Sequence, residues 1–211
     1  MGVKTLDYDS GKLYFDTASA SWFHMGGKHG QGQVINGYNF NGKYPNAAVF
    51  EFEKINIGPD VEVIVSGTNA LVLKETNGSG IVIKTNVQND LDDSGVSLET
   101  DGQVALGRDD ATTATFSANG AGGTLQIRGS GIINKGAFEA KGAGGRVILA
   151  YVTAFVGDDG TIDAGEVIHL TKPSIYGVLD VNTTYLVRTP FAHEEDLTAG
   201  FRFEEGSGTT T

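Results

Sequence analysis

Residues 49–84 read VFEFEKINIGPDVEVIVSGTNALVLKETNGSGIVIK, and apolar and polar residues alternate through this stretch in short bursts. Period-two bursts that are rich in Val, Ile and Phe are typical of β-strands. Clusters of Gly, Asn, Asp, Thr, Ser and Pro separate the bursts at residues 58–60, 67–69 and 77–80, and we interpret each cluster as a turn. No burst has the apolar spacing of three and four that an amphipathic helix requires. The stretch therefore predicts an all-β core of short strands.

The same pattern returns at residues 123–165, which read GTLQIRGSGIINKGAFEAKGAGGRVILAYVTAFVGDDGTIDAG. Together, the FEFEKINIGPDVEVIVSG and GAGGRVILAYVTAFVGDDGTIDAGE segments resemble the β-solenoid regions of secreted and cell-surface proteins of the adhesin type. The resemblance implies a right-handed parallel β-helix with stacked rungs and a continuous aliphatic interior. An antiparallel β-sandwich is the alternative, because short strands fit both architectures. In either fold we expect Val63 and Ile148 to be buried.

The C-terminal residues 197–211, LTAGFRFEEGSGTTT, are similar to the opening strand of laminin-G-like jelly rolls. An isolated strand is not stable in water. It must therefore pair within its own chain, belong to a following domain or add to the sheet edge of a neighbouring subunit. Leu197, Phe201 and Phe203 are the candidate assembly residues of this strand. We accordingly divide the chain into an N-terminal cap or edge segment (1–45), a β-solenoid core (46–190) and a C-terminal strand (191–211).

The composition excludes several classes of function. The chain has 211 residues with a net charge of −11, which argues against nucleic acid as a partner because nucleic-acid binding needs a basic surface. There is no apolar run long enough for a membrane span, so membrane insertion is not expected. Cysteine is absent, which excludes disulfides and thiol catalysis. Glycine occurs 31 times, without a three-residue period, and suits tight corners between stacked strands.

One loop carries a calcium-like pattern. Residues 90–95, DLDDSG, place oxygen ligands at Asp90, Asp92 and Ser94, and Asp101 stands at the twelfth position. Alternate oxygen ligands followed by Gly form the first half of a calcium loop, whose twelfth position is normally a bidentate Glu. Calcium is thus the one candidate cofactor, and a solvated turn is the alternative interpretation.

Aromatic residues are frequent in residues 1–45. They either cover the open end of the solenoid or form a sugar-binding platform. The candidates for such a platform are Tyr14, Trp22, Tyr38 and Tyr44.

Three functions remain open. The first is an extracellular or cell-surface structural or adhesive module, such as a subunit of a fibre or filament that associates with itself, with other extracellular proteins or with polysaccharide. The second is a module that binds carbohydrate or calcium. The third is a polysaccharide-degrading β-helix enzyme, whose acid–base chemistry would need paired carboxylates such as Asp92 and Asp109. Consecutive Asp residues in Gly-rich turns are more often solvated, so the sequence favours a protein without catalytic residues.

Overall fold

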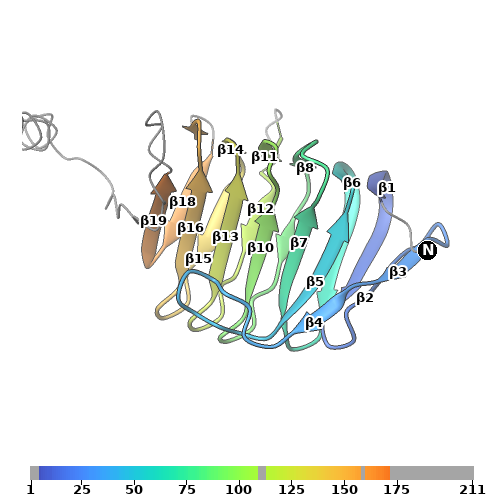
Figure 1. Ribbon diagram of the computed structural model, residues 1–211, viewed down its shortest axis with the longest axis horizontal. Helices are drawn as coiled ribbons and strands as arrows, with labels where there is room; N and C mark the ends of the chain where they lie inside the picture. The colour runs from blue at the N-terminus through green and yellow to red at the C-terminus, as the bar shows by residue number, and fades with distance from the viewer. Residues whose placement is uncertain (1–4, 109–112, 158–159, 172–211) are drawn as a thin grey trace, which may run out of the picture.

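The computed structural model describes residues 5–108, 113–157 and 160–171, and these residues form an all-β structure of three sheets (Figure 1). The eight-stranded sheet consists of β1 (Thr5–Asp16), β2 (Ser21–His24), β3 (His29–Gln31), β6 (Lys54–Ser66), β8 (Ile81–Ile83), β11 (Val104–Gly107), β14 (Ile132–Lys135) and β17 (Phe155–Val156). The seven-stranded sheet consists of β4 (Gln33–Ile35), β5 (Ala47–Phe52), β7 (Ala70–Glu75), β10 (Gly95–Glu99), β13 (Thr124–Gly129), β16 (Arg146–Tyr151) and β19 (Glu166–Thr171). The four-stranded sheet consists of β9 (Val87–Gln88), β12 (Thr115–Ser117), β15 (Ala137–Ala140) and β18 (Thr161–Ala164).

The sheets are mostly parallel, because the chain visits them in turn. From β7 to β16, each strand hydrogen-bonds to the strand that comes three later in the sequence, as in the series β7, β10, β13, β16 and β19. Among the strands of the described residues, antiparallel pairing is confined to β1–β2, β2–β3 and β4–β5, and outside the strands one antiparallel bridge joins Phe40 to Lys43. An antiparallel β-sandwich, the alternative that the strand pattern allowed, is therefore wrong for this part of the chain.

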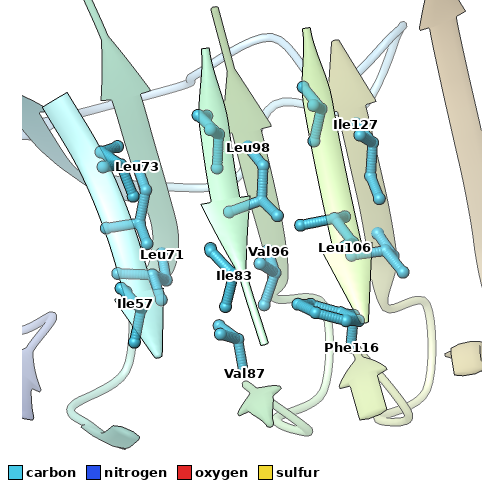
Figure 2. Close-up of a cluster of buried hydrophobic side chains, with 14 of the residues drawn as sticks. Ile57, Leu71, Leu73, Ile83, Val87, Val96, Leu98, Leu106, Phe116 and Ile127 are labelled. Carbon is cyan, nitrogen blue, oxygen red and sulfur yellow. The ribbon is translucent and has the colours of Figure 1, made fainter. Parts of the chain in front are cut away.

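The parallel register places like residues above one another in the core. Leu71, Val96 and Leu125 occupy matching positions on β7, β10 and β13, and all three are fully buried. Figure 2 shows side chains from successive strands converging on this shared interior, among them Leu98 and Phe116. Burial of an aliphatic side chain of this size stabilises the fold by roughly 1.5–3 kcal/mol. The columns of aliphatic residues therefore hold the sheets together.

The turns predicted at residues 67–69 and 77–80 are present, but the prediction of a turn at residues 58–60 is wrong. β6 continues straight through Gly58, Pro59 and Asp60. The register against β1 shifts here, since Tyr8 pairs with Ile57 and Ser10 with Asp60. Proline cannot donate a hydrogen bond to a regular ladder, and the irregularity accommodates it without ending the strand.

The N-terminal segment contributes strands to both larger sheets. β1 pairs in parallel with β6, and β2 and β3 extend the same sheet in antiparallel fashion. Trp22 on β2 is 3% exposed and packs edge-on against Phe52 of β5. Trp22 of this segment is therefore part of the hydrophobic core, beside β5.

The two side chains that we expected to be buried, Val63 and Ile148, differ in their exposure to solvent. Ile148 is fully buried, as predicted. Val63 is only partly buried, although it packs against the core. It lies near the end of β6, where β1 is the neighbouring strand. None of the described residues forms a helix that could cross a membrane.

Candidate functional site

The most distinctive surface feature is a hairpin arm, residues 36–46, that joins β4 to β5. Figure 1 shows this blue loop lying in front of the seven-stranded sheet and reaching toward β16. Its two halves pair through Tyr38 N to Pro45 O (2.8 Å) and Phe40 N to Lys43 O (2.8 Å). Asn41 and Gly42 form the tip with φ angles of 49° and 91°. Positive φ at both central residues is the requirement of a type I′ hairpin turn, which Asn-Gly satisfies.

The inner side of the arm packs on the outer face of the seven-stranded sheet, the face opposite the core. Phe40 is fully buried and forms a second apolar cluster with Ala47, Val49, Ala70 and Val72, against which Ile35 and Tyr38 pack. These small and β-branched residues leave room for the ring between the arm and the sheet. The arm is therefore a packed layer and not a solvated loop.

Tyr38 anchors the middle of the arm. Its hydroxyl donates a 2.9 Å hydrogen bond to Glu99 Oε1 on β10. The same carboxylate oxygen accepts hydrogen bonds from Ser97 Oγ at 2.8 Å and from Gln126 Nε2 at 3.3 Å. Burial and the negative charge of Glu99 raise the pKa of Tyr38, so the phenol stays protonated and remains a donor.

Two cations hold the tip of the arm. Lys43 Nζ donates to the carbonyl oxygen of Gly122 at 2.5 Å and lies 3.4 Å from that of Gly144. Both glycines have left-handed φ angles, 70° and 72°, and lie in the corners that precede β13 and β16. Arg146 Nη2 donates to the carbonyl oxygen of Phe40 at 3.0 Å. Burial and then the charge of Arg146 lower the pKa of Lys43, while Asp93 and Glu166 act in the opposite direction.

The outer side of the arm is polar and uncharged. Asn39 and Tyr44 face each other across the two halves, because the pairs on either side of them are Tyr38 with Pro45 and Phe40 with Lys43. Tyr44 is 64% exposed, and Asn39 and Asn46 are exposed as well. Asn39 Oδ1 accepts a 2.9 Å hydrogen bond from Gly42 N, and Asn46 Oδ1 lies 3.4 Å from Gly37 N. The two carboxamide oxygens thus brace the arm.

The arm itself was not anticipated from the sequence. The Asn41-Gly42 dipeptide between Phe40 and Lys43 is nevertheless a hairpin signal in its own right. The sequence could have located the hairpin by that signal. It could not have located the sheet face on which the hairpin lies, because that depends on contacts with residues about eighty to one hundred positions away.

Two aspartates of the calcium pattern, Asp90 and Asp92, form hydrogen bonds to the segment at residues 117–121. Asp90 Oδ1 accepts from Ser117 Oγ and Asn119 N, both at 2.8 Å, and Asp92 Oδ1 accepts from Ala121 N at 2.8 Å. Ser94 Oγ accepts from Asn89 Nδ2 at 3.1 Å. Asp101 lies in a separate exposed bend after β10. Among the described residues there is no group of three or more His, Cys, Asp or Glu side chains that could hold a metal ion.

The four aromatic candidates for a sugar platform lie in different surroundings. Trp22 is buried in the core, and Tyr38 faces the sheet through its bond to Glu99. Tyr14 stacks on Phe23 with a centroid distance of 4.3 Å. Tyr44 is the one of the four that is largely exposed, on the outer side of the arm. The structure therefore does not bring these four rings together on one surface.

A buried carboxylate lies at the corner after β7. Glu75 is 2% exposed, and its oxygens accept hydrogen bonds from Thr100 Oγ1 at 2.5 Å, from Asn77 N at 2.6 Å and from Gly80 N at 3.2 Å. Burial raises its pKa, but these hydrogen bonds and one from Ser79 outweigh that effect and bring the pKa below its ordinary value. Glu75 is thus held as an ionised acceptor that fixes the turn at residues 76–80.

No protein-family model, curated protein or solved structure matches the chain. The described residues define the class of fold, which is an all-β structure of mostly parallel sheets. The candidate assembly residues Leu197, Phe201 and Phe203 lie outside the described residues.

Proposed function

We propose that the chain is a structural or adhesive module of an extracellular or cell-surface protein, and that its three sheets form a β-solenoid. The return of the chain to each sheet after every third strand supports the solenoid. Parallel strands joined by crossovers are almost always right-handed, so we propose a right-handed parallel β-helix. In this interpretation each repeat contacts mainly its neighbours, and the aliphatic columns provide the stability.

The observation that carries the proposal is the residue-by-residue register of β13 with β16. Thr124 pairs with Arg146, and the pairing continues without a shift to Gly129 and Tyr151. The corners that precede the two strands are also alike, since both consist of Ala-Gly-Gly at residues 121–123 and 143–145. The corner before β13 could therefore lead into β16 without a change of sequence. Repeats that are joined in the same way suit an extended structural rod.

A deletion of one whole repeat tests the solenoid. Removing residues 124–145 joins Gly123 to Arg146 and leaves the corner sequence unchanged. In a solenoid the shortened chain folds with β16 in the place of β13 and keeps a cooperative unfolding transition. The control removes residues 124–134, which is out of phase with the repeat and should prevent folding. Loss of folding in both variants would contradict the solenoid.

A second experiment tests the structural role. If the chain builds an assembly through its C-terminal strand, removal of residues 197–211 leaves a folded protein that no longer forms large particles in light scattering. If the strand only covers its own core, the shortened monomer is less stable. Turnover of a polysaccharide by the full chain would reject the structural proposal in favour of an enzyme.

A further inference from the structure

We propose that the outer side of the hairpin arm, formed by Asn39, Tyr44 and Asn46, binds a neutral oligosaccharide. The proposal goes beyond a structural role, because a sugar could bind whether or not the protein assembles. It rests on three features of the arm: its uncharged surface, the chemistry of its exposed groups and the rigidity that its inner side provides.

The surface of the arm is uncharged in an otherwise acidic protein. The chain carries a net charge of −11, yet Lys43 is the one charged residue in residues 36–46. Its ammonium group is turned toward the carbonyl oxygens of Gly122 and Gly144. An anionic ligand would gain no cation on the outer side, and a cationic ligand would gain no carboxylate. A neutral ligand is therefore favoured.

The exposed groups suit a polyhydroxylated molecule. Tyr44 offers a largely exposed ring, which can cover the apolar face of a sugar, and a hydroxyl that can donate or accept. The carboxamides of Asn39 and Asn46 offer N–H donors, while their oxygens brace the arm at Gly42 and Gly37. Tyr, Asn and Gly also dominate the binding loops of antibodies, because Tyr gives contact area at low entropic cost and Asn gives adaptable hydrogen bonds.

The inner side of the arm holds this surface in place before a ligand arrives. Phe40 is fully buried, Tyr38 bonds to Glu99, and Lys43 and Arg146 fix the tip. A loop that is already ordered loses less conformational entropy on binding. The alternation along the hairpin therefore separates two tasks, with anchoring residues facing the sheet and ligand-binding residues facing solvent.

Affinity electrophoresis in native gels tests the proposal with the full chain. The gels contain a neutral soluble polysaccharide, namely hydroxyethylcellulose, xylan, galactomannan, laminarin or dextran, or the anionic polysaccharide alginate. We expect at least one neutral polymer to retard the protein more than alginate does. If no neutral polymer retards it, or if alginate retards it most, the proposal is wrong.

Variants then locate the site. Tyr44→Ala should raise the dissociation constant for the best polymer roughly tenfold, as expected for an exposed aromatic anchor, and Asn39→Ala should raise it several-fold. The matched control is Phe23→Ala, which removes an exposed ring of β2 (48% exposed) and should leave binding unchanged. Equal losses in Tyr44→Ala and Phe23→Ala would overturn the proposal.

A third variant tests the role of the anchored arm. Lys43→Met leaves Asn39, Tyr44 and Asn46 in place but removes the bonds to Gly122 and Gly144. We expect weaker polysaccharide binding together with faster proteolytic cleavage within residues 36–46. Faster cleavage with unchanged binding would show that the ligand does not depend on the ordered arm, and would overturn this assignment of the site.

Discussion

Arg146 Nη2 on β16 donates a 3.0 Å hydrogen bond to the backbone carbonyl of Phe40, which is 106 residues earlier in the chain. This contact joins the tip of the arm to the strand next to the edge strand β19, and Figure 1 shows the arm passing in front of the sheet toward β16. The arm thereby bridges several strands that would otherwise be linked only through their neighbours.

Replacing Arg146 by Ala should lower the free energy of unfolding by roughly 1.5–3 kcal/mol, the usual contribution of a hydrogen bond to a charged group. Urea unfolding measures this change. The control is Arg128→Ala on the neighbouring β13, where the side chain is exposed and the expected change is within about 0.5 kcal/mol. Equal effects in the two variants would show that the bond to Phe40 contributes nothing specific.

Ile148→Asp should abolish folding. The side chain is fully buried on the outer face of β16, and an unpaired carboxylate there would be left without solvent. Val63→Asp should be less harmful, since Val63 is only partly buried. Val156→Asp is the exposed control, with 43% of its residue surface open to solvent. Soluble expression and far-ultraviolet circular dichroism distinguish the three, and a well-folded Ile148→Asp variant would contradict the described packing.

Glu75 should make stability depend on pH in the acid range. The pKa of its carboxyl is lowered in the fold below the ordinary value of 4.5, so the folded state favours the ionised form. The stability that this provides is fully present above the unfolded pKa and is lost as the pH falls through the folded pKa.

Glu75→Gln should therefore lose roughly 1–3 kcal/mol near pH 7, and its stability should decline less steeply than that of the wild type as the pH falls below 4.5. Chemical unfolding at a series of pH values measures both effects. Glu62→Gln is a suitable comparison, because Glu62 forms an exposed ion pair with Lys12 at 2.8 Å. Parallel acid profiles for wild type and Glu75→Gln would rule out Glu75 as the source.

Calcium should bind at most weakly at Asp90, Asp92 and Ser94, because hydrogen bonds from the backbone of Asn119 and Ala121 already engage the two carboxylates. A site would raise the melting temperature of chelator-treated protein when millimolar calcium is added. Asp92→Asn keeps an oxygen acceptor for Ala121 N but removes the charge, so it should eliminate any such rise. No shift in the wild-type protein would dismiss the site.

The local features of the fold follow from the sequence. The apolar run at residues 70–73 and the Asn-Gly-Ser-Gly cluster that follows at residues 77–80 define β7 and its turn, because short apolar runs between turn signals are typical of strands and glycine allows left-handed corners. The exception at Pro59 shows the limit of this reasoning. A Gly-Pro-Asp cluster normally marks a turn, but here β1 pairs along both sides of it and keeps the chain extended.

The tertiary structure alone decided which residues meet. The sequence placed Phe40 and Lys43 in the N-terminal segment 1–45, and it grouped Tyr14, Trp22, Tyr38 and Tyr44 as equivalent aromatics. In the folded structure Trp22 is buried in the core, Tyr38 donates a hydrogen bond to Glu99, and Tyr44 is exposed. The reason is physical. Strand and turn preferences act over a few neighbouring residues, whereas the position of the arm depends on bonds to Gly122 and Arg146, whose place beside it exists only after the parallel sheets have formed.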